Sequence, residues 1–231
     1  MKRFFGSKKG NNIVISGSEH MHLSKVMRLV AGDKIIASLN DDYDYYCTLL
    51  SVGKNESLAG IDYSELCPAL PKRNITLYMM LPKKEYLDSI LAKAVELGVN
   101  KIVPFTSEYT MIKDIRRERV ETQIMTACKQ CERSRLVEVT DPIKFENLPA
   151  ELANYDLSIF AYENEKERFD PKILDSKQNI AVIVGNEAGF SPAEAQILQK
   201  AATSVSLGTR ILRCDTAVVA TLALVSVLSG N

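Results

Sequence analysis

The sequence has no excess of charge of either sign, because its 29 lysines and arginines balance 29 aspartates and glutamates. For the chain as a whole, this balance argues against a nucleic-acid partner. Long hydrophobic runs are also missing, since the longest apolar stretch, 217–228, is too short to span a bilayer. The charged start of the chain has no apolar core of signal-peptide length behind it. We therefore expect a cytoplasmic protein without a membrane partner.

Residues that build metal sites and disulfide frameworks are scarce. The five cysteines, an odd number without a framework pattern, indicate free thiols in a reducing compartment. Cys128 and Cys131 form a C-x-x-C pair, but no second pair completes a zinc site. The two histidines, His20 and His22, have no cysteine or aspartate cluster beside them. We expect no metal centre.

The charge that is present is unevenly distributed. Residues 1–34 carry seven basic side chains against two acidic ones, whereas residues 35–71 carry one against six. A segment polarised in this way can present a basic face to phosphates although the whole chain is neutral. The N-terminal part is therefore a candidate RNA-binding region.

The first 70 residues are predicted to form a β-rich domain. Strands are expected over 13–15, 34–38 and 45–50, a spacing typical of a small barrel or sandwich. Between the first two, apolar residues at 23, 26, 27 and 30 predict a helix. Lys25 and Arg28 lie three residues apart on another face of that helix. They either form an ordinary solvated surface or contact RNA.

A linker with two prolines at 67–71 divides the chain into domains of residues 1–70 and 71–231. After it, strands expected at 75–81 and 99–105 flank a helix over 86–97 that Gly98 ends. This is a β–α–β unit, for which a right-handed parallel connection is expected. A further buried strand is expected at 156–162. The second domain is therefore predicted to be α/β.

The last fifth of the chain holds two glycine turns, and we expect the functional site there. A buried strand at 180–184 precedes Gly185-Asn-Glu-Ala-Gly-Phe190, and Ser191 and Glu194 form a capping box with Pro192 between them. A second strand, 203–206, precedes Leu207-Gly-Thr-Arg-Ile-Leu-Arg213 and an apolar helix that Asp215 or a neighbour can cap. Loops at the carboxyl ends of parallel strands are where open α/β sheets bind ligands.

These two turns resemble the Gly-Pro-Glu-Gly-Gly-Phe-Ser and Leu-Gly-x-Arg-Ile-Leu-Arg-Thr-Glu-Thr-Ala motifs of the ribosomal RNA small subunit methyltransferase E family. Asn186, Ala188 and Asp215 depart from the Pro, Gly and Glu of those motifs. The resemblance implies a PUA-like RNA-binding barrel followed by a SPOUT methyltransferase domain with a trefoil knot. It also implies a homodimer that methylates N3 of a uridine in small-subunit (16S) ribosomal RNA, in the assembled subunit, with S-adenosyl-L-methionine as methyl donor.

The resemblance and the turn chemistry together predict the site residues. The apolar residues and open backbone of the strand ends and glycine turns are expected to bind the cofactor: Phe160, Ala161, Gly185, Asn186, Glu187, Gly189, Leu207, Gly208, Ile211 and Leu212. The expected catalytic residues are Arg210, Arg213 and Asp215. Basic residues and a histidine of the RNA-binding segments are expected to contact RNA: Arg3, His22, Lys25, Arg28 and Arg133.

Three questions stay open at this level. Asp215 is either a helix cap or a catalytic group, and Glu187 or Asp215 is the carboxylate available to take the N3 proton or to orient the arginines. A related SPOUT enzyme could methylate a ribose 2′-hydroxyl with the same cofactor fold. A non-catalytic RNA-binding or ribosome assembly factor could also keep the fold.

Overall fold

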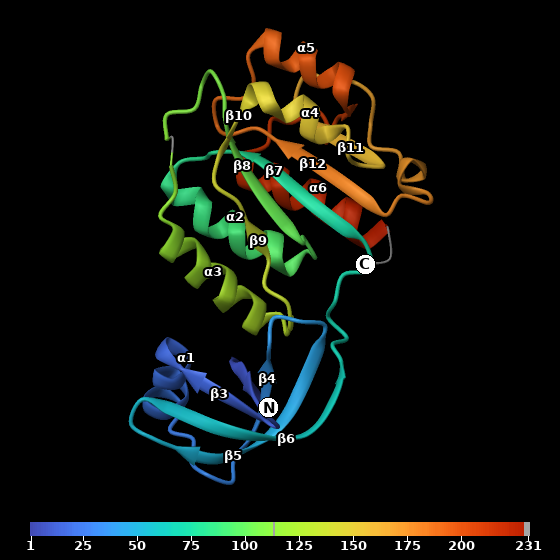
Figure 1. Cartoon of the computed structure of the whole chain (residues 1–231). Coiled ribbons are helices and arrows are strands. Elements are labelled where there is room, and N and C mark those ends of the chain that lie inside the picture. Colours follow the sequence, from blue (N-terminus) through green and yellow to red (C-terminus); the bar gives the residue numbers. More distant parts are fainter. Residues whose placement is uncertain (113, 229–231) are drawn as a thin grey trace. The chain divides into compact units, whose positions relative to one another are not determined.

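The computed structural model describes residues 1–112 and 114–228, and the chain divides into two compact units. The first contains Met1–Leu70 together with Cys128–Leu136, and the second contains Pro71–Ala127 and the chain from Val137 onward. Figure 1 shows the elements of both units along the chain.

The first unit is built on one six-stranded sheet in the order β1-β4-β5-β6-β3-β2. Its strands are β1 (Lys2–Phe5), β2 (Ser7–Lys9), β3 (Asn12–Ser16), β4 (Lys34–Ser38), β5 (Tyr43–Val52) and β6 (Glu56–Leu66). Because Gly6 alone joins the two edge strands β1 and β2, the sheet must curl until its edges approach, as a half-barrel. A Cβ at Gly6 would lie 2.6 Å from Ile13 Cγ2, so this corner requires glycine.

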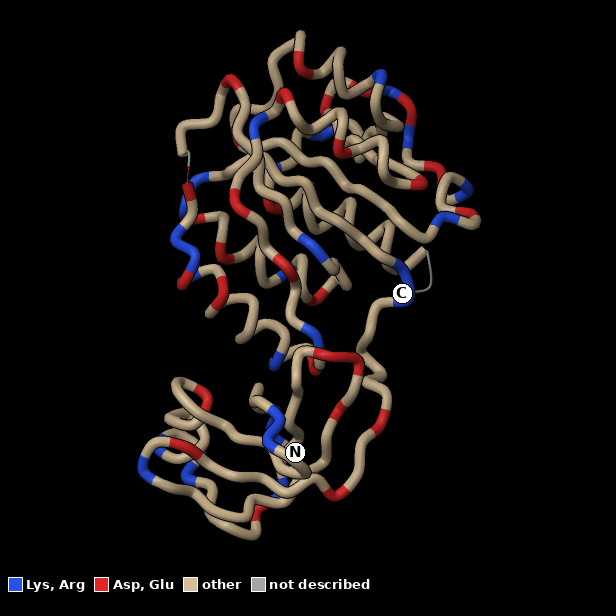
Figure 2. Tube along the Cα trace, in the orientation of Figure 1, with Lys and Arg blue, Asp and Glu red and all other residues tan. Residues whose placement is uncertain are grey.

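The interior of the half-barrel follows from the two-residue period of its strands. In β3, Ile13 and Ile15 are buried while Val14 between them is only half-buried. Phe4 of β1, Ile35 of β4 and the other apolar residues that face inward complete one continuous core. Basic and acidic residues occupy different stretches of this unit's chain (Figure 2).

The helix predicted over 19–30 is only partly correct. The chain forms a short helix, α1 (Gly17–Met21), followed by a π-helical turn, η1 (His22–Val26), that ends well before residue 30. Leu23 is fully buried, but Val26 and Val30 are 67% and 61% exposed, so the predicted apolar face does not form. The sequence pattern failed because a widened π-turn changes which side chains share a face.

A short segment from the middle of the chain completes the first unit. The Ser134 hydroxyl donates to the carbonyl of Asp41 at 2.7 Å, and the Leu136 N–H donates to the Asn40 side chain at 2.8 Å. Nothing in the sequence pattern indicated that residues 128–136 belong with the first 70.

The second unit contains a seven-stranded, all-parallel sheet in the order β10-β8-β7-β12-β11-β13, with β9 paired to β8. Its strands are β7 (Asn74–Met80), β8 (Lys101–Thr106), β9 (Glu138–Val139), β10 (Ile143–Lys144), β11 (Leu157–Ala161), β12 (Asn179–Val184) and β13 (Thr203–Val205). The helices are α2 (Lys84–Glu96), α3 (Arg117–Gln130), α4 (Leu148–Leu152), α5 (Pro192–Ala201) and α6 (Cys214–Leu228), with 3-10 turns η2 (Phe145–Asn147) and η3 (Pro171–Leu174). The end of α3, from Cys128, is counted with the first unit.

The sheet is buried on both faces, as the unbroken apolar run at 180–184 predicted. Ala181 and Ile183 of β12 pack in a cluster with residues of α4 and α5, whereas Val182 and Val184 point the other way. On that opposite face α6 contacts both β12 and α2. A strand covered on both sides has no room for polar residues, which explains its composition.

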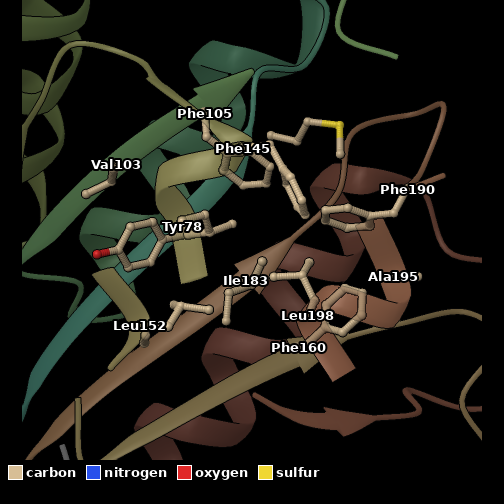
Figure 3. Packing of buried hydrophobic residues seen from close by; sticks show 13 residues of the cluster. Tyr78, Val103, Phe105, Phe145, Leu152, Phe160, Ile183, Phe190, Ala195 and Leu198 are labelled. Atoms are coloured by element: carbon tan, nitrogen blue, oxygen red, sulfur yellow. The ribbon is translucent and has the colours of Figure 1, made fainter. Parts of the chain in front are cut away.

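Three aromatic rings connect the core of the second unit to its loops. Phe190 meets Phe160 edge-to-face at 5.0 Å between ring centroids and stacks with Phe105 at 6.1 Å (Figure 3). A Cβ at Gly185 would lie 2.8 Å from the Phe190 ring, so the first glycine loop closes over its own anchor only because residue 185 is glycine. No helix of the described residues is long and apolar enough to cross a membrane.

Candidate functional site

The carboxyl ends of three parallel strands bring the predicted loops to one edge of the second sheet. β12 leads into Gly185–Phe190, β13 leads into Leu207–Arg213, and β11 leads into Tyr162 and Glu163. The two glycine turns do not follow neighbouring strands, because β11 lies between β12 and β13 and pairs with both. Its end therefore forms a third wall between them.

A cavity of about 450 Å³ lies between these loops. This volume is in the range of small-molecule sites. The loops supply most of the lining, and Tyr86 of α2 and Lys83 before it supply another wall: Lys83, Tyr86, Ala161, Tyr162, Glu163, Val184, Gly185, Asn186, Glu187, Ala188, Gly189, Leu207, Gly208, Arg210, Ile211, Leu212, Arg213, Cys214 and Ala217. The structure therefore brings together nine of the ten residues predicted for the cofactor, together with Arg210 and Arg213.

The tenth, Phe160, is fully buried and does not line the cavity. Phe160 packs behind the residues that line the cavity, against the ring of Phe190, and so supports the first glycine loop. Its influence on a ligand would act through that loop.

Asn186 holds the first glycine loop in shape. Its side-chain amide donates to the carbonyl of Leu81 at 3.2 Å, and its side-chain oxygen accepts from the N–H of Ala188 at 2.9 Å. Gly189 follows with φ +68°, which favours glycine. The predicted capping box then starts α5: Ser191 Oγ accepts from the N–H of Glu194, and the Glu194 carboxylate accepts from the N–H of Ser191.

The second turn exposes its functional groups. Gly208 has φ +119°, and a Cβ built there would meet no atom within 4 Å. Arg210 and Arg213 are exposed, and Ile211 is 88% exposed. A ligand entering here would therefore meet an open backbone, an uncovered apolar side chain and two cations.

Asp215 lies outside the cavity lining, unlike the two arginines. The last helix was expected to be capped by Asp215 or a neighbour; it begins at Cys214, so Asp215 belongs to its first turn and is not the cap. Its carboxylate accepts a hydrogen bond from the N–H of Thr216 at 2.9 Å. An acidic residue in the first turn stabilises the helix through the positive end of its dipole.

Several lining residues were not predicted. Lys83 and Tyr86 follow β7, a fourth parallel strand whose carboxyl end points to the same edge, and this was the signal that could have found them. Burial raises the pKa of the Cys214 thiol to about 12, and the negative charges of Glu187 and Asp215 act in the same direction. Burial also raises the pKa of Tyr86, and the nearby Arg213 opposes that shift. The negative charge of Glu187 contributes to the raised pKa of both Tyr86 and Cys214, so these two groups lie near it at the same end of the cavity.

The residues predicted to contact RNA divide into two groups. Arg3 and Arg133 are buried, 8% and 3% exposed, which does not favour a direct RNA contact. Lys25 and Arg28 are exposed, although Arg28 has left the helix and adopts φ +54°. His22 is half-buried, and its Nδ1 lies 3.3 Å from Lys129 Nζ.

Within the described ranges there is no group of three or more histidine, cysteine, aspartate or glutamate side chains placed to hold a metal ion. The five cysteines, all within the part of the chain that the structure describes, form no disulfide.

The sequence is similar to those of known proteins over most of its length. Residues 68–226 match the RNA methyltransferase domain family. A ribosomal RNA small subunit methyltransferase E of Aquifex aeolicus is 31% identical over 220 residues, which cover 92% of this chain and 93% of the relative. The chain belongs to the ribosomal RNA small subunit methyltransferase E family.

Further members of the methyltransferase E family agree along the whole chain. The Bacillus subtilis member is 29% identical over 220 residues, covering 88% of this chain and 85% of the relative. The crystal structure of the Neisseria gonorrhoeae member, bound to S-adenosyl methionine, matches with a TM-score of 0.89 at 25% identity and covers 99% of this chain and 98% of that one. The α/β methyltransferase fold is therefore shared over both units, and the family uses S-adenosylmethionine.

Proposed function

We propose that this protein transfers a methyl group from S-adenosyl-L-methionine to N3 of a uridine in small-subunit (16S) ribosomal RNA. The proposal includes a homodimer, a knotted SPOUT domain in residues 71–231 and a PUA-like RNA-binding domain in residues 1–70. The main observation in its support is that the two glycine turns, which resemble the motifs of the family, line the same cavity.

The residues present fit S-adenosylmethionine. Leu207, Ile211 and Leu212 offer an apolar slot for the adenine ring, and backbone groups near Gly185 and Gly208 can read its edge. Gly208 has no side chain, and no atom lies within 4 Å of the position that a Cβ would take, so a ligand can approach the backbone there. The Glu163 carboxylate, also in the lining, is suited to accept hydrogen bonds from ribose hydroxyls.

The chemistry requires little besides positioning and a proton acceptor. When bound, the cofactor supplies a methyl group that its sulfonium already activates. N3 of uracil carries a proton, so the protein must remove it and stabilise the negative charge that spreads to the neighbouring carbonyls. Arg210 and Arg213, both exposed in the lining, are placed to neutralise that charge or to hold a phosphate.

The first unit is proposed to hold the RNA around the target. Lys25 and Arg28 are exposed cations of its basic N-terminal stretch and are available to phosphates. The neutral overall charge does not oppose this, because phosphate contacts depend on local basic residues.

The test is nucleoside analysis by chromatography and mass spectrometry. Small ribosomal subunits that lack the modification are incubated with the protein and S-adenosylmethionine and then digested. We expect N3-methyluridine. A ribose-methylated nucleoside would replace the proposed specificity by 2′-hydroxyl chemistry, and RNA binding without cofactor binding or product would identify an assembly factor. Free ribosomal RNA, tested in parallel, decides whether the assembled subunit is required.

A further inference from the structure

A second, smaller cavity lies on the other side of the first glycine loop. Its volume is about 220 Å³, and Lys83, Asn186, Glu187 and Ala188 line it as well as the larger cavity. The two hollows therefore share a wall made by the Asn186–Ala188 backbone and its side chains. A single pyrimidine ring is much smaller than S-adenosylmethionine, just as the second cavity is smaller than the first. The volumes are therefore consistent with a base in the second cavity and the cofactor in the first.

The remaining walls of the small cavity suit a flat, partly apolar ligand. Pro82, Met111 and Ile112 contribute apolar surface, and Tyr109 contributes an aromatic ring. Tyr109 is 42% exposed and Met111 is 87% exposed, so both are accessible from solvent. Aromatic side chains beside an open hollow are the usual platforms on which unstacked RNA bases lie.

Glu187 is the one carboxylate on the shared wall. Its Oε1 accepts a hydrogen bond from the backbone N–H of Lys83 at 3.1 Å, which fixes the side chain. The Cys214 thiol lies nearby, since burial and, after it, the negative charge of Glu187 raise the thiol's pKa. A carboxylate has about four lone-pair positions, so acceptor capacity remains for a further donor. Asp215, the other candidate carboxylate, lines neither cavity.

From these contacts we infer that the small cavity receives the target uracil and that Glu187 accepts the proton of its N3. The inference rests on the proposed function and adds to it the base site and the proton acceptor. The N3–H bond breaks and its proton passes to the Glu187 carboxylate. The nitrogen electron pair forms the new N–CH₃ bond while the S–CH₃ bond breaks, and that bonding pair stays on sulfur. The products are N3-methyluridine, S-adenosylhomocysteine and a protonated Glu187 that returns its proton to solvent.

The first experiment compares Glu187→Gln with Glu146→Gln, an identical chemical change at an exposed residue outside both cavities. Glu187→Gln should lower kcat by about 10²- to 10⁴-fold, the usual contribution of a positioned base. Its calorimetric Kd for S-adenosylmethionine should change much less than kcat, because glutamine keeps the size of this cavity-lining residue and a hydrogen-bonding oxygen, whereas the chemical step loses its proton acceptor. Glu146→Gln should match the wild type in both.

The pH profile separates a proton acceptor from a merely structural residue. In Glu187→Gln the N3 proton must leave to hydroxide, so log kcat should rise by about one for each pH unit. The wild-type rate should instead change little with pH over the same range, because a carboxylate rather than hydroxide accepts the proton. Tyr109→Ala should raise KM for the small subunit at least fivefold, about the loss of one base-stacking contact, and Tyr109→Phe should restore most of the affinity.

Each contrary result has a distinct meaning. If Glu187→Gln kept the wild-type kcat, or if its kcat reached a plateau with rising pH, Glu187 would be excluded as the proton acceptor. The proposed function would remain intact. Loss of cofactor binding in Glu187→Gln would reassign the residue to the cofactor. If Asp215→Asn alone abolished kcat, the acceptor would be Asp215. A wild-type product other than N3-methyluridine would overturn the proposed function and this inference together.

Discussion

The guanidinium of Arg3 and the carboxylate of Asp44 form a two-pronged ion pair inside the first unit, with N–O distances of 2.5 and 2.7 Å. The side chains are only 5% and 4% exposed, and Arg3 also donates to the Ser38 hydroxyl at 2.7 Å. The pair joins β1 to β5, two strands that do not neighbour each other in the sheet. Arg3, predicted as an RNA contact, therefore acts within the fold.

Asp44→Ala should destabilise the protein by about 3–5 kcal/mol, because it leaves a buried guanidinium without its carboxylate. The double change Arg3→Met with Asp44→Leu, which removes both charges, should recover most of that loss. Urea unfolding followed by circular dichroism measures both. Equal losses in the single and the double variant would show that packing, rather than the unpaired charge, determines the cost.

Gly208→Ala should impair cofactor binding beyond its effect on stability. A non-glycine residue at φ +119° costs on the order of 1–3 kcal/mol, and the added methyl group projects at the cavity wall. Gly32→Ala is the matched control, since Gly32 has φ +95° and equally open surroundings in the first unit. Both variants should melt at lower temperature, whereas only Gly208→Ala should raise the calorimetric Kd for S-adenosylmethionine, by about tenfold or more. A similar Kd for both would place the cofactor elsewhere.

Arg213→Ala should lower the methylation rate by about 10²- to 10³-fold, since it removes a cation from the place where negative charge develops on the uracil. The side chain is exposed, so the melting temperature should not change. Arg116→Ala, also exposed but outside both cavities, should leave the rate at the wild-type value. Single-turnover assays on small subunits measure the chemical step directly. An unchanged rate in Arg213→Ala would remove it from catalysis.

Lys25→Gln and Arg28→Gln should weaken RNA binding and reduce its dependence on salt. Each exposed cation that contacts a phosphate should lower the slope of log K against log salt concentration by about one. Lys172→Gln, the loss of an exposed cation in the second unit, controls for net charge. Filter binding of a ribosomal RNA fragment at several salt concentrations gives the slopes. If all three variants keep the wild-type slope, Lys25 and Arg28 are simply a solvated surface.

The thiols should differ in their reactivity toward alkylating reagents. Burial raises the pKa of Cys47 to about 11 and that of Cys214 to about 12. At pH 8 roughly one Cys47 in a thousand and one Cys214 in ten thousand would then be the reactive thiolate. Half-buried Cys131 should be labelled by iodoacetamide first, and labelling of Cys214 should accelerate as pH rises. Peptide mass spectrometry gives the order, and early labelling of Cys214 would contradict the burial argument.

Short sequence patterns predicted the structure correctly where each pattern is compatible with a single local conformation. The Ser191–Glu194 capping box and the buried strand before Gly185 were predicted and are confirmed. The helix predicted over 86–97 is also confirmed: α2 ends at Glu96, and Gly98 follows with φ +84°. Each depends on contacts within a few residues of the chain. The cavity between the two glycine turns was predictable for a different reason: parallel strands bring their carboxyl ends to one edge of a sheet.

The sequence by itself determined most of the strands and helices, the family and most of the residues around the cavity. The tertiary structure alone decided that β11 lies between β12 and β13, that Arg3 is buried against Asp44, and that residues 128–136 complete the first unit. It also placed Glu187 on the wall shared by two cavities and left Asp215 outside both. These facts depend on pairings between residues far apart in the chain, and periodicity, capping and turn signals report only on near neighbours.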